Sequence, residues 1–169
     1  RTRKPIVVWN ITRTCNLRCV HCYADSHAER YPGELTWEQC CAVIDDLADY
    51  KVNALLLSGG EPLLHPQLPQ ILQRATEKGL KVTISTNGTR ITPEYARLFK
   101  DLGVAYVGIS LDGIGAVHDQ FRGVKGAFDG AIRGFKLCEE VGQKTGLRLT
   151  LTRNNVQSME QILNFIEQE

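Results

Sequence analysis

Three cysteines lie close together near the start of the chain, in the stretch TCNLRCVHCYADS. Cys15, Cys19 and Cys22 follow the spacing Cys-x3-Cys-x2-Cys. An odd number of thiols in one short loop is not the pattern of a disulfide framework. Soft thiolate ligands select zinc, copper(I) or iron–sulfur clusters. The spacing therefore indicates a metal site.

The identity of a fourth ligand separates two interpretations of this site. Structural zinc takes four protein ligands, and His21 or His27 could complete a Cys3His set. A [4Fe–4S] cluster normally takes four thiolates. Three thiolates leave one iron with an open position, which is where metal-centred chemistry takes place. The residues of the loop leave both interpretations open.

Strand-like and helix-like segments alternate along the chain, which predicts a parallel sheet with right-handed crossovers. Thr36 is the expected N-cap of the first helix, with Gln39 completing a capping box. Another helix is expected to end near residues 78–79, one to begin at 92–94, one to span 126–141, and one to follow Ser158. The expected strands are 5–12, 54–57, 81–85, 105–111 and 147–152.

A polar, glycine-containing or asparagine-containing stretch follows every expected strand. The cysteine loop comes after the first strand, and SGGEP, STNG, SLDG and TRNN come at the ends of the others. In a barrel these ends converge on one mouth. An open doubly wound sheet concentrates them near one switch point instead. We therefore favour an α/β barrel, or part of one, over an open sheet.

Composition bounds the class of protein. The chain has 169 residues and a net charge of +1, which gives no reason to expect nucleic acid as a partner. It has no apolar run of the roughly 18–20 residues that a membrane span needs, and no signal peptide pattern. We therefore expect a cytoplasmic protein with reduced thiols, and we assign Cys40, Cys41 and Cys138 to helices rather than to a cluster. A start without Met and an end inside a helical pattern lead us to expect a fragment of a longer protein.

The cysteine motif together with Ser58-Gly59-Gly60-Glu61-Pro62 resembles the radical S-adenosylmethionine (SAM) superfamily. The resemblance covers essentially the whole chain. It implies a radical SAM core domain over 1–169, folded as a partial (β/α)6 TIM-like barrel with about five β/α units present. We also expect the fragment to stop before the last strand and to lack a C-terminal extension, in which the tetrapyrrole-modifying branch described below usually carries a second iron–sulfur cluster.

The same resemblance explains the missing fourth cysteine. In this superfamily, SAM chelates the fourth iron of a [4Fe–4S] cluster through its amino and carboxylate groups. An electron from the cluster breaks the sulfonium C–S bond, and the resulting 5′-deoxyadenosyl radical takes a hydrogen atom from the substrate. The implied cofactors are a [4Fe–4S] cluster and SAM, and the implied partner is an electron donor such as flavodoxin or ferredoxin.

The resemblance also assigns roles to the residues around the strand ends. The carbonyls of Gly59 and Gly60 and the carboxylate of Glu61 are expected at the SAM ammonium, and Pro62 is expected at the same cofactor site. His21 and Tyr23 are expected at the adenine, and Arg122 at the SAM carboxylate. The ribose hydroxyls and the methionine end are expected at Ser85, Thr86, Asn87, Ser110 and Asp112. Turn chemistry at Asn87-Gly88 and Asp112-Gly113, and a solvated Arg122 at a helix start, are the alternatives.

Longer stretches narrow the resemblance to one branch. VVWNITRTCNLRCVHCYADS, LLLSGGEPLLHP and GISLDGIGAVHDQFRG together resemble the tetrapyrrole-modifying enzymes. These act in haem d1 synthesis and in the siroheme route to haem, and the haem d1 enzyme, which removes propionate side chains, is the preferred parallel. One alternative is a peptide-modifying or protein-modifying enzyme of the pyrroloquinoline quinone or sulfatase-maturation type. A non-catalytic Cys3His zinc module is the alternative from a different class.

Overall fold

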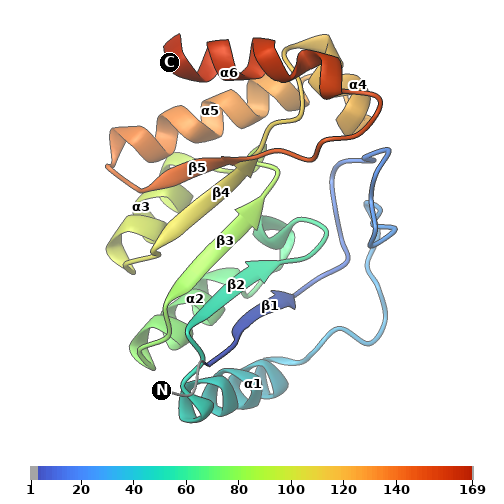
Figure 1. Ribbon diagram of the computed structural model, residues 1–169. Helices are drawn as coiled ribbons and strands as arrows, with labels where there is room; N and C mark the ends of the chain where they lie inside the picture. The colour runs from blue at the N-terminus through green and yellow to red at the C-terminus, as the bar shows by residue number, and fades with distance from the viewer. Residues whose placement is uncertain (1–3, 169) are drawn as a thin grey trace.

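Five parallel strands lie side by side in chain order. The computed structural model describes residues 4–168, so the predicted domain limits 1 and 169 fall outside the described residues. Figure 1 shows the strands as a curved sheet with the long loop after the first strand at their carboxyl ends. The strands are β1 (Ile6–Asn10), β2 (Ala54–Ser58), β3 (Val82–Thr86), β4 (Tyr106–Ser110) and β5 (Thr145–Arg148).

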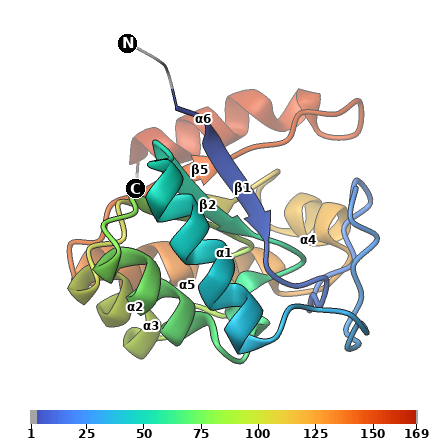
Figure 2. The ribbon, with the colours of Figure 1, turned by 90° about the horizontal axis from the view of Figure 1, so that it is seen from below.

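Helices follow the strands and pack against the sheet, as the views from two directions show (Figures 1 and 2). Two short 3-10 turns, η1 (Pro62–Leu64) and η2 (Val156–Ser158), interrupt the connections. The helices are α1 (Trp37–Tyr50), α2 (Leu68–Glu77), α3 (Pro93–Asp101), α4 (Ala116–Arg122), α5 (Ala127–Glu140) and α6 (Met159–Gln168).

Strand order distinguishes a barrel-type sheet from a doubly wound one. The order is β1-β2-β3-β4-β5, and every neighbouring pair is parallel. A doubly wound sheet reverses its order at a switch point, and the described strands show no such reversal. The expected partial TIM-like barrel with five β/α units is therefore confirmed.

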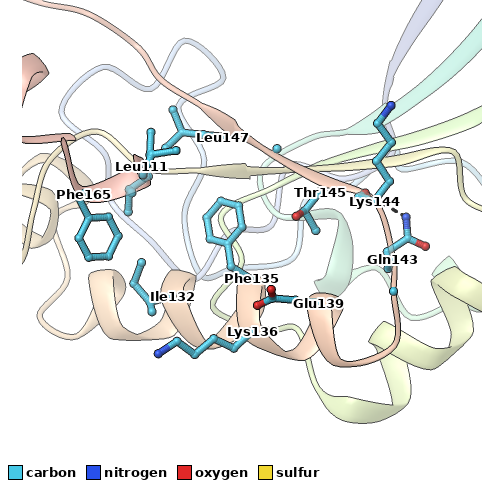
Figure 3. A pocket seen from close by; sticks show the side chains of 13 residues that line it. Leu111, Ile132, Phe135, Lys136, Glu139, Gln143, Lys144, Thr145, Leu147 and Phe165 are labelled. Carbon is cyan, nitrogen blue, oxygen red and sulfur yellow. Dashed lines mark hydrogen bonds between the residues drawn. The ribbon is translucent and has the colours of Figure 1, made fainter. Parts of the chain in front are cut away.

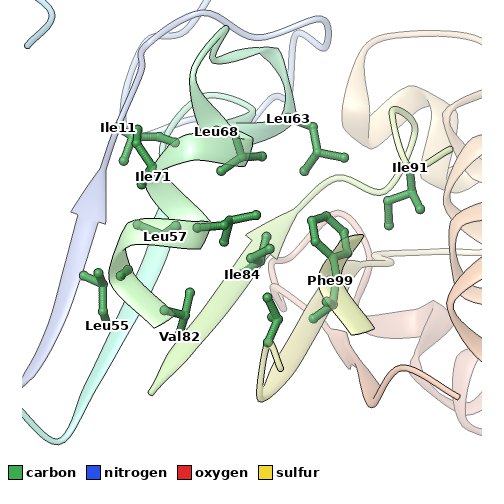
Figure 4. Close-up of a cluster of buried hydrophobic side chains, with 14 of the residues drawn as sticks. Ile11, Leu55, Leu57, Leu63, Leu68, Ile71, Val82, Ile84, Ile91 and Phe99 are labelled. Carbon is green, nitrogen blue, oxygen red and sulfur yellow. The ribbon is translucent and has the colours of Figure 1, made fainter. Parts of the chain in front are cut away.

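Apolar side chains between the sheet and its helices form the main core (Figure 4). Alternate residues of a strand point to opposite faces, so Leu55 and Leu57 of β2 both face the helices and are fully buried. Ile84 of β3 and Phe99 of α3 are also fully buried in this core. The other face of the sheet is thereby left free to carry the polar side chains of the strand ends.

Helix ends follow the sequence signals closely. Thr36 Oγ1 accepts a hydrogen bond from the backbone N–H of Gln39, and Gln39 Oε1 accepts one from the backbone N–H of Thr36, so the capping box is confirmed. Thr92 likewise caps α3 by accepting from the N–H of Tyr95. Helix α6 begins at Met159, directly after Ser158.

The expected limits of the fifth strand were wrong. The sequence favours 147–152, whereas β5 spans Thr145–Arg148. The strand is paired from Val107↔Thr145 to Ser110↔Arg148, so it ends where its partner β4 ends. Beyond that point the N–H of Thr150 donates to Asp112 Oδ1 at 2.7 Å, a side-chain acceptor that replaces the ladder. The strand-like sequence continues beyond Arg148, but β4 has already ended and no longer pairs with it.

Candidate active site

A cavity of about 270 Å³ lies at the carboxyl ends of the strands. All three cysteines of the motif line it, together with most of the residues that the sequence places at the site. Three expected residues, Glu61, Pro62 and Asp112, are buried behind the wall instead. The expected residues that line it are Cys15, Cys19, His21, Cys22, Tyr23, Gly59, Gly60, Ser85, Thr86, Asn87, Ser110 and Arg122.

The two glycines of SGGEP hold the start of the cysteine loop against the end of β2. The N–H of Gly60 donates to Thr12 O at 2.8 Å, and the N–H of Glu61 donates to Thr14 O at 2.9 Å. A Cβ at Gly60 would lie 2.5 Å from the carbonyl oxygen of Thr14, and one at Gly59 would collide with the carbonyl oxygen of Thr12. Only glycine allows two backbones to approach this closely.

Helix α4 holds the middle of the cysteine loop. The N–H of Arg18 donates to Arg122 O and the N–H of Val20 donates to Phe121 O, both at 3.0 Å. The ring of His21 packs on the ring of Phe121 with centroids 4.5 Å apart. Burial lowers the pKa of His21, with Arg122 adding to the shift, so the ring is neutral near pH 7. Phe121 therefore holds the His21 ring at the cavity wall.

The three thiols differ in exposure: Cys15 is buried, Cys19 is half-buried and Cys22 is exposed. Burial raises the pKa of Cys15 to about 11 in the absence of a metal. Two donors nevertheless point at the sulfur atoms. The N–H of Leu17 donates to Cys15 Sγ at 3.4 Å, and Arg122 Nη1 donates to Cys19 Sγ at 3.6 Å. Such donors stabilise the thiolate that a metal ligand must be.

A zinc ion and an iron–sulfur cluster place their protein ligands differently. Within residues 4–168, no three His, Cys, Asp or Glu side chains are grouped as a site for one metal ion. In a zinc site all ligand atoms lie about 2.0–2.3 Å from one metal, whereas an iron–sulfur cluster gives separate irons to separate thiolates. His27, one of the possible fourth zinc ligands, is turned to Asp25, with Nε2 3.1 Å from Oδ1.

Buried polar atoms without partners surround the same cavity. They are Nδ1 of His21, Oγ of Ser26 and Nε of Arg122. Buried polar groups are normally hydrogen-bonded, so unpaired ones at a cavity wall indicate a missing ligand. The lining is therefore chemically suited to a polar molecule bound beside the three thiols, as SAM would be.

Arg122 is buried at the end of α4 and reaches the cavity, so it is not the solvated helix-start arginine of the alternative interpretation. Its Nη2 forms an ion pair with Asp112 Oδ2, and its Nη1 contacts Cys19. Asp112 is fully buried and also accepts from the N–H of Thr150. The carboxylate of Asp112 thus faces the guanidinium of Arg122 rather than the cavity, which differs from the expected contact with SAM.

Glu61 also differs from the expectation. Its carboxylate is fully buried and accepts three hydrogen bonds, from Leu63 N at 3.1 Å, Thr86 Oγ1 at 2.7 Å and Asn87 N at 2.8 Å. These donors draw it into the wall between β2 and β3, away from the cavity. In this structure Glu61 joins the loops that form the cavity, and of the SGGEP motif only Ser58, Gly59 and Gly60 line it.

Two cavity residues from the last strand were missed by the sequence interpretation. Arg148 is the final residue of β5, and Thr150 follows it. The expected strand, 147–152, extends beyond the true end of β5, so it did not identify either residue as lying at the strand end. The alternation of faces could have found Arg148, since it is paired with Ser110, which was expected at the site. Other missed lining residues are Val8, Leu17, Ala24, Ser26, Leu56 and Ser58.

A second hollow, of about 520 Å³, lies elsewhere and carries none of the expected site residues. Figure 3 shows Phe135 and Ile132 of α5 and Phe165 of α6 around it, beside Leu147 of β5. Its walls are mainly apolar, and it has no thiol and no histidine in its lining. The chemistry indicated by the sequence is therefore confined to the cavity at the strand ends.

The family model described as the Radical SAM superfamily matches residues 9–166. The chain belongs to the radical SAM superfamily. Its relatives include Fe-coproporphyrin III synthase of Methanosarcina barkeri, 48% identical over 100% of this chain and 42% of the relative. Pre-heme d1 synthase of Dinoroseobacter shibae is 45% identical over 99% of this chain and 42% of the relative. The expected resemblance to the haem-synthesis branch of radical SAM enzymes is therefore confirmed.

Solved structures agree on the fold of this radical SAM chain. SuiB of Streptococcus suis, determined with S-adenosylmethionine bound, aligns with a TM-score of 0.83 at 19% identity, over 97% of this chain and 38% of SuiB. The chain spans less than half the length of the curated relatives it matches. None of the helices in the described part of the chain is both long and apolar enough to cross a bilayer.

Proposed function

We propose that this radical SAM protein modifies a siroheme-derived tetrapyrrole, removing side chains in haem d1 synthesis or in siroheme-dependent haem synthesis. The observation that carries the proposal is the joining of the cysteine motif and the SGGEP glycines in one cavity, in a chain whose relatives are named for iron porphyrins and pre-heme d1. Loss of a carboxyalkyl side chain begins with removal of an unactivated hydrogen atom, which radical chemistry can achieve.

Cys15, Cys19 and Cys22 would hold a [4Fe–4S] cluster, and SAM would occupy the rest of the cavity. Together these cofactors would supply the removal of a hydrogen atom from the substrate by radical chemistry. The observations that support this assignment are the three free thiols around one cavity and the unpaired buried polar atoms in its wall.

The residues of the chain would bind and orient SAM. Arg122 has a planar guanidinium at the cavity, held by Asp112 and Cys19, and its remaining N–H donors would bind the SAM carboxylate. The backbone carbonyls of Gly59 and Gly60 would accept hydrogen bonds from the SAM ammonium. His21 and Tyr23, which line the cavity beside Cys22, would pack against the adenine.

Polar residues at the ends of β3 and β4 would fix the remainder of SAM. Ser85, Thr86 and Asn87 line one side of the cavity and Ser110 lines another. Their hydroxyl and amide groups suit the ribose hydroxyls and the methionine end. The Asn87 side chain is itself held, since its Nδ2 donates to Asn16 Oδ1 at 3.1 Å and its Oδ1 accepts from Thr89. Held side chains bind with less loss of rotamer freedom.

The test is anaerobic incubation of the intact protein with didecarboxysiroheme, SAM and a reductant such as reduced flavodoxin, followed by mass analysis. We expect a product whose mass corresponds to loss of side chains. The mass distinguishes iron-coproporphyrin III from a product altered at the propionates. The Cys19→Ala variant is the control and should give no product. Deoxyadenosine formation by the wild type with an unchanged tetrapyrrole would contradict the proposal and favour a peptide substrate.

A further inference from the structure

The two arginines that line the active-site cavity differ in their partners. The lining includes two guanidinium groups, Arg122 and Arg148, and no carboxylate. The charge of Arg122 is balanced by Asp112 directly behind it. Arg148 has no ion pair within residues 4–168 and is exposed. Arg148 therefore places a cation without an acidic partner on the side of the cavity formed by β5.

Gly108 makes room for the Arg148 side chain on the inner face of the sheet, and Gly146 makes room for Tyr106. Gly108 of β4 is paired with Gly146 of β5. A Cβ at Gly108 would lie 2.6 Å from Cδ of Arg148, so the arginine stem lies over this residue. A Cβ at Gly146 would lie 2.5 Å from the hydroxyl oxygen of Tyr106. Neither glycine is among the positive-φ residues, so what these glycines supply here is space rather than backbone freedom.

The direction of the Arg148 side chain separates it from Arg122. Arg148 is paired with Ser110 at the end of β4, and its stem crosses Gly108, two residues earlier in that strand. The Arg148 side chain therefore runs back along β4, from the end of the strand towards its middle. Arg122, by contrast, contacts Cys19 in the cysteine loop. The two cations thus lie in different regions of one cavity, Arg122 beside the thiols and Arg148 over the inner face of β4.

We propose that Arg148 binds a carboxylate of the substrate. The inference rests on the proposed function, because tetrapyrroles of the coproporphyrin type carry several propionate groups, one of which can reach a cation while another side chain reacts. A guanidinium offers two parallel N–H donors to a carboxylate. Arg148 is then a specificity-determining residue that orients the macrocycle relative to SAM.

Equilibrium binding to the intact, anaerobically reconstituted protein tests this role separately from turnover. Didecarboxysiroheme is titrated into wild type, Arg148→Gln and Arg148→Lys and followed in the porphyrin absorption band, and SAM is titrated separately. Arg153→Gln is the matched control, because Arg153 is exposed in the next loop and lies outside the cavity. An exposed surface arginine can be replaced without loss of the fold, so binding is interpretable in every variant.

We expect Arg148→Gln to weaken didecarboxysiroheme binding by about 10- to 100-fold, the loss expected for a charge-assisted pair of hydrogen bonds. Arg148→Lys should lie between this variant and the wild type, and Arg153→Gln and the SAM affinities should stay within about twofold. Equal loss in Arg153→Gln, unchanged binding in Arg148→Gln, or loss of SAM affinity instead would overturn the role of Arg148. Unchanged binding with normal wild-type turnover would overturn this inference alone, whereas a wild type that binds no tetrapyrrole would overturn both proposals.

Discussion

The carboxylate of Asp112 and the guanidinium of Arg122 form a buried ion pair behind the cysteine cavity. The pair joins the end of β4 to the end of α4, and Arg122 extends the connection to Cys19. Asp112 also holds the chain that leaves β5, through the N–H of Thr150. The ion pair is therefore the point at which three walls of the cavity meet.

The Asp112→Asn variant should be strongly destabilised. Breaking a buried pair leaves an uncompensated charge, and we expect the free energy of unfolding to fall by about 3 kcal/mol. Asparagine keeps an oxygen acceptor for Thr150, so the change isolates the charge. Urea unfolding measures the loss, with Asp46→Asn as the control because Asp46 is exposed. Equal stability of the two variants would show that the pair does not hold the walls together.

The Glu61→Gln variant tests the buried acceptor of the SGGEP loop. Glutamine places an N–H2 group where two oxygens now accept from Leu63, Thr86 and Asn87. At least one buried donor then faces a donor, so we expect a loss of about 1–3 kcal/mol in unfolding free energy. Glu140→Gln, at an exposed position of α5, should be neutral. A stable Glu61→Gln protein would mean that its carboxylate is not tied into the wall.

Sequence patterns predicted the fold well because each unit carries local signals. Alternating strands and helices, the Thr36 cap and the polar strand ends together indicated the barrel, and the sequential strand order confirms it. Helix α4 was missed because its residues carry no extended apolar stripe: it is seven residues long and begins after Gly115. The end of β5 was misplaced because strand limits depend on the neighbouring strand, which local sequence does not contain.

The site was predicted less evenly than the fold. Motif residues such as Cys15, Gly59 and Ser85 line the expected cavity. Glu61 and Asp112 carry carboxylates that spacing alone could not orient, since their partners, Thr86 and Arg122, lie far from them in the chain or on an unpredicted helix. Polar motif residues can therefore hold the structure behind a cavity together instead of lining it.

The Gly59→Ala variant should bind less iron–sulfur cluster than its loss of stability alone would explain. Gly59 and Gly33 both have positive φ, so alanine strains the backbone at either position by about 1–3 kcal/mol. Only at Gly59 does the new Cβ collide with Thr12, whereas Gly33 has open space around it. Iron content after reconstitution should fall several-fold relative to Gly33→Ala. Similar iron content in both variants would argue against close packing of the cysteine loop on this glycine.

His118 should make stability depend on pH. Its pKa is lowered from 6.5 to about 4, mainly by burial, so the folded state binds its proton less readily than the unfolded state. Its contribution is present above the unfolded pKa and is lost as pH falls from about 6.5 towards 4, at up to about 1.4 kcal/mol per pH unit.

Urea unfolding of wild type and His118→Asn over this pH range measures that dependence. The asparagine oxygen can still accept the N–H of Asp112, which His118 Nδ1 now accepts at 3.0 Å. The variant should lose less stability on acidification than the wild type. Identical pH slopes would show that His118 does not titrate differently in the folded and unfolded states.

The most direct measurement of the central claim compares wild type, Cys19→Ala and Cys41→Ala after anaerobic reconstitution with iron and sulfide. Cys41 lies on α1 outside the cavity, so it is the matched control. Bound iron and sulfide are assayed, and 5′-deoxyadenosine is measured after addition of SAM and dithionite. We predict a brown wild type and Cys41→Ala with iron and sulfide in equal amounts and deoxyadenosine production, and neither property in Cys19→Ala. A colourless wild type that binds one zinc, or deoxyadenosine production by Cys19→Ala, would contradict the account.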